Sequence, residues 1–416
     1  MTQRKLLIIA GIVVGAAFLA VMLYQIPYIH QRAAWRLDLA YTYLRGVVYP
    51  ADAVPTPKPV TAVPVEALNP SPTVTATATV TSTQVLEITS TPAPSPTPIP
   101  EKVDLPYYGW EQQDWNNCGP AALSMYLNFY GWEGNQFDIS NVIKPTRGDR
   151  NVNIEELAHF SRNYAGWLET QYRVGGDLEL LKQLLAAGIP VMIESSFYFG
   201  GPYWPNDDLW AAHYLLVTGY DSEAGTFTVQ DTYRGPNQTL KAGTLDENWQ
   251  SFNRVFVLIY LPAQKESVLD ILGPLWDDTY SHQRAMEMAE AEIATDPEDA
   301  FAWFNLGSNH VYFEQYEQAA QAYDQARQAG LPQRMMRYQF GPFLAYFHSD
   351  RIDELVSLSK YTLQRTPNSE EALLWHGWGL YRQGDFNGAV ADFRAALEAN
   401  YLYTDAQYAL DFVLGQ

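Results

Sequence analysis

Residues 112–126 read QQDWNNCGPAALSMY, and this stretch decides the fold of the chain. It contains Cys118, the one cysteine among 416 residues, and Pro120 follows two positions later. Proline is favoured in the first turn of a helix, because the amide groups there have no partner within the helix. Apolar residues recur after Pro120 with helical spacing, so the pattern predicts a helix that begins near Cys118. The partial positive charge at a helix N-terminus stabilises a thiolate, which favours a nucleophilic cysteine over a buried structural one.

A second stretch, residues 213–231, reads HYLLVTGYDSEAGTFTVQD and predicts a β-hairpin. If Tyr220 pairs with Thr226, Asp231 falls diagonally opposite His213 on the same face of the sheet, because side chains alternate along a strand. A carboxylate in this position fixes the tautomer of an imidazole and stabilises the imidazolium. A shift of one residue in the register would place the two side chains on opposite faces.

Cys118, His213 and Asp231 therefore form a candidate catalytic triad, in which a thiolate attacks a carbonyl and the histidine handles the proton. His159 is the competing base, but it falls on a predicted helix between the cysteine and the strands. Taken singly, the cysteine and the histidine also suit a packed core, where such residues are common. The three residues in this arrangement favour catalysis.

Residues 103–263 are expected to form one domain of α+β class, because helices come first and an antiparallel sheet follows. Besides the helix after Cys118, the predicted elements are helices at 154–164 and 177–187 and strands at 191–197, 213–220, 226–231 and 254–261. The segment 198–212, rich in glycine, proline and aromatic residues, lies directly before His213. We expect Tyr198 and Trp204 in it to contact substrate, and a rigid surface loop is the alternative.

The motif Gln-x5-Cys-Gly-Pro, the motif His-Tyr-x-x-Val-x-Gly-Tyr and an aspartate at a strand end resemble papain-superfamily peptidases that process double-glycine leader peptides of bacteriocins. The stand-alone relatives without a transporter are the most similar, over about 160 residues. The resemblance implies a papain-like cysteine peptidase with Cys118 as nucleophile, His213 as general base and Asp231 as orienting carboxylate. It also implies a glutamine that donates to the oxyanion. Gln112, six residues before the cysteine, fits best, and Gln113 is the alternative.

The sequence before this domain predicts a membrane anchor. Residues 6–24 are nineteen uncharged residues, enough for a helix of roughly 28 Å, and Arg4 and Lys5 precede them. No small-residue cleavage site follows, which favours an uncleaved signal anchor at 1–30 over a cleaved signal peptide. Residues 31–50 form a juxtamembrane segment with a weak amphipathic pattern. We expect a single-pass protein of the cell membrane.

Residues 51–102 predict a disordered stalk. Eleven prolines and eleven threonines fall in 51–100, and such a composition cannot bury a core. Stalks of this kind typically stand outside the cell, so the C-terminal bulk is expected to be extracytoplasmic. The net charge of −21 opposes binding to phosphate backbones, and nucleic acid is therefore not an expected partner. No metal-ligand spacing and no cofactor motif is present, and one cysteine excludes a multi-thiolate site.

Residues 266–416 resemble tetratricopeptide repeats and predict an all-α solenoid. Residues 300–332 and 370–401 share one frame of small, aromatic and leucine positions, with a divergent copy between them that Gly341 and Pro342 interrupt. Residues 280–297 predict the second helix of an earlier unit, and 404–414 a capping helix. The repeats are expected to dock a peptide or protein partner, and a stabilising appendage is the alternative.

Together these features predict a membrane-anchored, extracytoplasmic cysteine peptidase that hydrolyses peptide bonds. Two alternatives remain open. An amidase or acyltransferase uses the same scaffold and the same triad. A non-catalytic surface adaptor would bind proteins through the repeats alone, with the cysteine domain as a degenerate scaffold.

Overall fold

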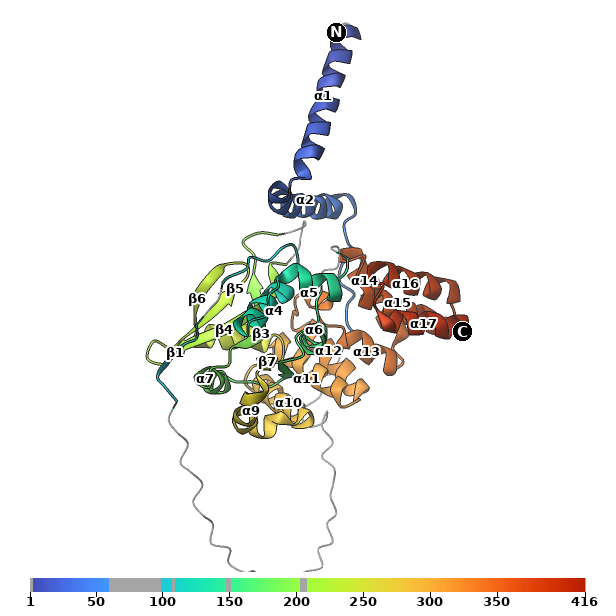
Figure 1. Ribbon diagram of the computed structural model, residues 1–416. Coiled ribbons are helices and arrows are strands. Elements are labelled where there is room, and N and C mark those ends of the chain that lie inside the picture. The colour runs from blue at the N-terminus through green and yellow to red at the C-terminus, as the bar shows by residue number, and fades with distance from the viewer. Residues whose placement is uncertain (1–2, 60–98, 107–108, 147–150, 203–207, 416) are drawn as a thin grey trace, which may run out of the picture.

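The computed structural model describes residues 3–59, 99–106, 109–146, 151–202 and 208–415 (Figure 1). Most of the predicted stalk lies outside these ranges, and so does Trp204. The described part contains a mixed helix and sheet domain, an array of helix pairs after it, and two N-terminal helices.

One antiparallel sheet forms the centre of the first domain, and within the described ranges it has seven strands in the order β2-β7-β3-β4-β5-β6, with β1 paired to β4. The strands are β1 (Lys102–Asp104), β2 (Glu169–Arg173), β3 (Val191–Tyr198), β4 (Trp210–Asp221), β5 (Thr226–Asp231), β6 (Gly235–Lys241) and β7 (Phe256–Tyr260). The helices are α4 (Cys118–Phe129), α5 (Gln136–Ile143), α6 (Ile154–Tyr164), α7 (Leu178–Ala186), α8 (Ala242–Gln250) and α9 (Lys265–Leu272). The predicted α+β class is confirmed.

Both faces of the sheet are buried. Leu216 of β4 packs into a core with α4, α5 and α6, whereas its neighbours Leu215 and Val217 pack into a second core with α7, α8 and α9. Strands covered on two faces carry nearly continuous apolar runs, which is why β3, β4 and β7 were predictable. The edge strands β2 and β6 carry mostly polar residues, and no pattern in the sequence predicted them.

The hairpin of β4 and β5 has a different register at its two ends. At the turn, Tyr220 pairs with Phe227, so the predicted pairing with Thr226 is wrong. The register shifts between Val217 and Gly219, and Thr218 is the extra residue of this β-bulge. The carbonyl of Thr218 accepts the N–H of Leu105, where β4 also meets β1. The turn is one residue shorter than predicted, and the extra residue of the bulge compensates for this difference in the pairing beyond it.

As a result the pairing near the site agrees with the sequence expectation. Leu215 lies opposite Asp231, and Asp231 is diagonal to His213 on one face. One extra residue in β4 therefore decides that the histidine and the aspartate meet.

The helix pairs after the sheet pack against one another in chain order (Figure 1). Their elements are α10 (Asp278–Thr295), α11 (Ala300–Tyr312), α12 (Tyr316–Gln328), α13 (Gly341–His348), α14 (Ile352–Arg365), α15 (Glu370–Arg382), α16 (Phe386–Ala399) and α17 (Thr404–Leu414), with the short 3-10 helices η2 (Gly273–Trp276) before α10 and η3 (Gln333–Arg337) before α13. The helices pack closely, since a Cβ on Gly307 would lie 2.8 Å from the ring of Tyr323. Gly341 and Pro342 do not interrupt a helix as expected. They begin α13, where proline is tolerated.

The domain and the helix pairs share one hydrophobic core, which runs from α4 and α6 to α11 and α12. Polar contacts join the same parts. Arg254, which follows α8, bonds Asp246 of α8 at 2.7 Å and Glu292 of α10 at 2.6 Å. Gln250 of α8 donates to Asp299 at 2.7 Å. The repeats are thus packed onto the domain.

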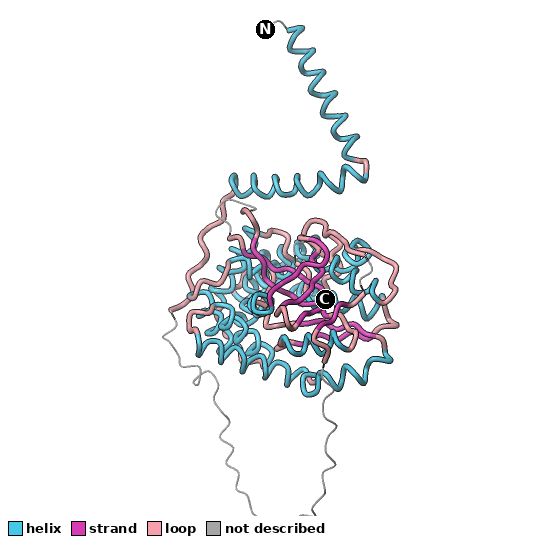
Figure 2. Tube along the Cα trace, turned by 90° about the vertical axis from the view of Figure 1, so that its left-hand side faces the viewer, coloured by secondary structure: helices cyan, strands magenta, loops and turns pink. Residues whose placement is uncertain are grey.

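The N-terminal helices are α1 (Gln3–Tyr24) and α2 (Pro27–Val48). In both views α1 points away from the rest of the chain, whereas α2 lies along its top (Figures 1 and 2). In the part of the chain that the structure describes, no helix combines the length and the apolar character needed to cross a bilayer. The span at residues 6–24 therefore stays a prediction.

Candidate active site

Cys118 is the first residue of α4, beside the N–H groups that the first turn of a helix leaves without a helical partner. Its neighbour Gly119 is packed against β4, because a Cβ there would lie 3.2 Å from the ring of Tyr214. The helix therefore presents Cys118 at the sheet surface, where the helix dipole favours an anion.

The loop before Cys118 is held by a network that the sequence did not reveal. Gln136 of α5 accepts from Asn117 at 2.8 Å and from the N–H of Asp114 at 2.7 Å. The side chain of Gln136 in turn donates to Glu111 at 2.9 Å. Lys144 is buried at the end of α5 and donates to the carbonyl of Asn116 at 2.8 Å.

Asn116 has a φ of 51°, in the left-handed region that asparagine tolerates better than most residues. The network therefore holds a tight turn immediately before Cys118. In the sequence, only the Asn116-Asn117 pair indicated this turn. The network that holds it could not be predicted, because Gln136 and Lys144 lie far from the turn in the chain.

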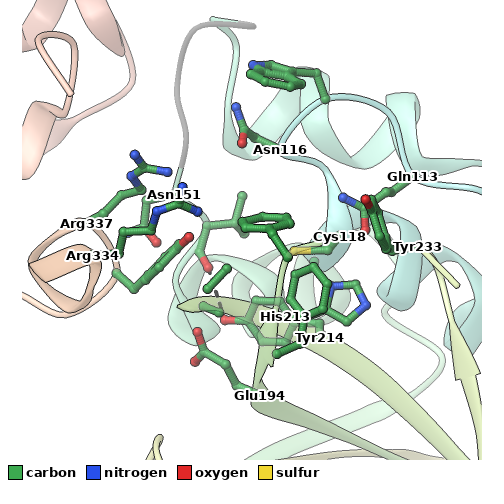
Figure 3. Close-up of a pocket in the computed structure, with 18 of the residues that line it drawn as sticks. Gln113, Asn116, Cys118, Asn151, Glu194, His213, Tyr214, Tyr233, Arg334 and Arg337 are labelled. Carbon is green, nitrogen blue, oxygen red and sulfur yellow. Dashed lines mark hydrogen bonds between the residues drawn. The ribbon is translucent and has the colours of Figure 1, made fainter. Parts of the chain in front are cut away.

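His213 of β4 and Asp231 at the end of β5 form the second half of the site. His213 is 3% exposed, and its Nε2 lies 2.8 Å from Asp231 Oδ1. The same oxygen accepts the N–H groups of Tyr233 and Arg234 at 2.8 and 2.9 Å. Nε2 is thereby committed to the aspartate, and Nδ1 is the ring nitrogen that remains for Cys118, which lies next to the ring (Figure 3).

The electrostatics favour a charged form of all three groups. Burial opposes ionisation of Cys118, but the hydrogen bond and the charge of His213 lower the pKa of the thiol below its ordinary value. Burial likewise opposes a charged His213, yet the hydrogen bonds to Asp231 and Cys118 raise its pKa to about 9. Burial raises the pKa of Asp231, but the hydrogen bond from His213 outweighs it and the pKa is lowered. These shifts all favour the thiolate, the imidazolium and the carboxylate over the corresponding neutral forms.

A pocket with about 830 Å³ of empty space opens beside Cys118, and we call it the Cys118 pocket. Gln113 lines it, whereas Gln112 is exposed and does not. The N–H of Gln113 bonds the carbonyl of Thr232 at 3.0 Å, and this contact holds Gln113 beside the site. The candidate oxyanion donor is therefore Gln113, and the placement expected for Gln112 is corrected.

Of the two residues expected to contact substrate, only Tyr198 is among the described residues. Tyr198 is 60% exposed at the end of β3 and does not line the Cys118 pocket, because its neighbour Phe197 faces the pocket instead. Trp204 lies outside the described residues. His159 is on α6 and hydrogen-bonded to Asn163, and it does not line the pocket.

The far wall of the Cys118 pocket comes from distant segments. Arg334, Arg337 and Tyr338, in and after η3, line it from the repeat side, and Thr42 of α2 lines it as well (Figure 3 labels the two arginines). No sequence pattern indicated that these segments reach the site. Among the described residues, no group of His, Cys, Asp and Glu side chains is arranged to hold a metal ion.

Comparison with known proteins gives one family match. Residues 102–257 match the model of a family described as the Peptidase_C39 like family. A protein described as a C39-like peptidase from Bacillus anthracis is 16% identical, with 38% of this chain and 98% of that chain covered and a TM-score of 0.30. The peptidase domain of Streptococcus ComA, a bifunctional ABC transporter involved in quorum sensing, is 16% identical, with 37% and 98% covered and a TM-score of 0.29.

A TPR protein is also among the similar structures. YrrB, a TPR protein with an unusual peptide-binding site, is 18% identical, with 37% of this chain and 80% of that chain covered and a TM-score of 0.30. No curated protein matches the chain.

Proposed function

We propose that the protein is a cysteine peptidase that hydrolyses peptide bonds through Cys118, His213 and Asp231, because residues 102–257 match the model of the Peptidase_C39 like family. One observation carries the proposal: His213 bonds Asp231 at 2.8 Å through Nε2 and turns its other nitrogen to the cysteine at the start of α4. This order of thiol, imidazole and carboxylate is the one that activates a thiol nucleophile.

The reaction begins with attack of the Cys118 thiolate on the scissile carbonyl carbon. A carbon–sulfur bond forms, and the carbonyl π electrons move to oxygen. As the carbon–nitrogen bond breaks, the His213 imidazolium gives its proton to the leaving amine. Water then attacks the thioester with His213 as base, which releases the acid product and restores the thiolate. Asp231 holds the imidazole in place throughout and stabilises its charged form.

Two donors are proposed for the oxyanion. The N–H of Cys118 belongs to the first turn of α4 and has no helical acceptor. The Oε1 of Gln113 accepts from the hydroxyl of Thr232 at 2.9 Å, which orients the amide and keeps its N–H groups for the pocket. Loss of one such donor typically lowers the rate by ~10²–10³-fold.

The repeats are proposed to dock the substrate, a peptide or protein. The argument is that Arg334, Arg337 and Tyr338 of the repeat region line the same pocket as Cys118. A polypeptide entering the site therefore contacts repeat residues.

Residues 6–24 are proposed to anchor the protein in the cell membrane in a single pass, with the domains outside the cytoplasm. The described part of α1 carries large apolar side chains that are mostly exposed, such as Ile12 at 65% and Phe18 at 67%. An apolar surface of this kind requires a cover. The full chain is expected to stay with membranes after an alkaline wash, and a chain without residues 3–24 is expected to be released. External protease should degrade residues 103–416 in intact cells, and protection would contradict the orientation.

The enzymatic proposal is tested by incubating the full-length protein with unfolded casein and following new amino termini. Hydrolysis is expected from the wild type and is expected to vanish in Cys118→Ala and His213→Ala. Asp221→Asn, which removes a carboxylate at the turn of the same hairpin, is the matched control. Equal hydrolysis by wild type and Cys118→Ala would reject the proposal.

A further inference from the structure

A second cavity lies between the peptidase domain and the first repeats, with about 1150 Å³ of empty space. Its walls include Glu155 of α6 on one side and Tyr312 of α11 on the other. Glu194 of β3 and Tyr338 line this cavity and the Cys118 pocket as well, so the two cavities meet at these residues. We call the second cavity the inter-domain cavity.

The walls of the inter-domain cavity are held together by side-chain amides. Asn253, between α8 and β7, donates to Asn309 of α11 at 2.9 Å, and its own N–H bonds Asn305 at 3.1 Å. Asn309 also bonds the ring of His282 on α10 at 2.9 Å, and this ring stacks on Tyr312 with 3.7 Å between centroids. These contacts join the peptidase domain to two repeat helices, so the cavity is part of the packed structure rather than a gap between mobile parts.

The ionisable groups around the junction are mainly carboxyls. Glu194 is 5% exposed, and Glu155 is close enough to influence it. Asp278 also lines the cavity, but Arg173 lies 4.0 Å from it and balances its charge. Burial lowers the pKa of His282, which is therefore neutral at pH 7.

Burial is the main cause that raises the pKa of Glu194, whereas Glu155 lines the cavity but is exposed to solvent and accepts from the Tyr172 hydroxyl at 3.5 Å. No cation is among the groups that influence either carboxyl. A cation between these carboxyls would lower their pKa and would be attracted to the carboxylates that it holds in the charged form. Tyr312 and Tyr338 add aromatic surface that suits the apolar stem of a long basic side chain.

We propose that the inter-domain cavity binds the part of the peptide substrate next to the scissile bond, and that Glu194 and Glu155 select a lysine or arginine in that part. The inference rests on the proposed peptidase function. The cavity adjoins the Cys118 pocket and shares Glu194 and Tyr338 with it, which argues for substrate as the occupant, and the carboxyls argue for a basic residue. A charge-assisted pair in a buried site is expected to favour the basic residue about tenfold over a neutral one.

The experiment is a cleavage profile. The full-length protein is incubated with a peptide library of mixed sequence, and mass spectrometry counts the residues that flank each cleaved bond. Lysine and arginine are expected to be enriched about tenfold at one position within four residues of the cleaved bond. Glu155→Gln is expected to reduce that enrichment to about twofold, relative to all cleavage by the same variant.

Glu223→Gln makes the same chemical change on an exposed turn and should keep the enrichment. Val311→Trp fills the inter-domain cavity from α11 and should reduce the enrichment as Glu155→Gln does. The test therefore still decides the matter if one of these two variants fails to fold. Cleavage without a basic preference, or with a preference that both variants leave intact, would overturn the inference and leave the peptidase proposal standing.

Two other outcomes also decide the matter. Cleavage at a fixed distance from the peptide amino terminus, whatever residue stands there, would mean that the site reads an N-terminal ammonium group, and it would overturn the choice of a basic side chain. Absence of any cleavage by the wild type would overturn the peptidase proposal and this inference together.

Discussion

Replacing Asp231 by asparagine tests how much the carboxylate contributes to the reactive state of Cys118. The pKa of His213 is about 9, against an ordinary value near 6.5. At ~1.4 kcal/mol for each pKa unit, the difference corresponds to about 3 kcal/mol in favour of the imidazolium. The hydrogen bond to Asp231 is the largest contribution that raises this pKa, and Cys118 adds the rest. We assign roughly half to Asp231, which is a factor of about 10–30 in the population of the thiolate–imidazolium pair.

The assay is alkylation of Cys118 by iodoacetamide between pH 5 and pH 10, followed by the mass of the intact protein. At pH 6 the Asp231→Asn protein is expected to react about 10–30 times more slowly than the wild type. The two rates should converge at high pH, where the thiol ionises without help. Asp221→Asn changes an exposed carboxylate on the same hairpin and should reproduce the wild-type profile. Superimposable profiles for Asp231→Asn and wild type would refute the reasoning.

Three further predictions use other parts of the molecule. Gln113→Ala is expected to lower kcat for casein hydrolysis by ~10²-fold or more, whereas the exposed Gln112 should tolerate alanine, and equal losses would contradict the reassignment. Gly307→Ala places a Cβ 2.8 Å from the Tyr323 ring and should lower the free energy of unfolding by about 1–3 kcal/mol in urea. Gly243→Ala, with open space around the new atom in α8, should not destabilise the protein, and a similar loss there would remove the packing argument. The raised pKa of Glu194 means that its folded form keeps a proton that the unfolded chain releases above about pH 4.5, so stability falls as pH rises. Glu194→Gln should therefore raise Tm more at pH 8 than at pH 5, and an equal change at both would contradict the buried neutral carboxyl.

The helix at Cys118 and the apolar strands were predictable from sequence because local spacing determines them. The edge strands β2 and β6 were not, since their residues are polar and only their neighbours in the sheet make them strands. The hairpin shows a subtler limit. The predicted pairing of Leu215 with Asp231 was right although the predicted pairing at the turn was wrong by one residue. The bulge at Thr218 compensates for that difference in register. That bulge depends on a contact with Leu105, more than a hundred residues away.

The choice between Gln112 and Gln113 also depended on a distant partner. Spacing favoured Gln112, but the backbone bond of Gln113 to Thr232 decides which side chain faces the pocket. Arg334 reaches the site only because the repeats pack onto the domain, and no local pattern in the sequence predicts such a contact. The sequence thus indicates the candidate nucleophile and its candidate partners, and tertiary contacts supply the walls of the site.

The central claim is that His213 activates Cys118, and its most direct test is inactivation of the full-length protein by an epoxysuccinyl thiol reagent across pH. We expect rapid labelling of Cys118 near pH 6 in the wild type. This labelling should be lost in His213→Ala, because the lowered pKa of the thiol depends on the neighbouring imidazolium. Labelling no faster than that of a free thiol, and equal in the two proteins, would contradict the account and leave the cysteine domain without a catalytic role.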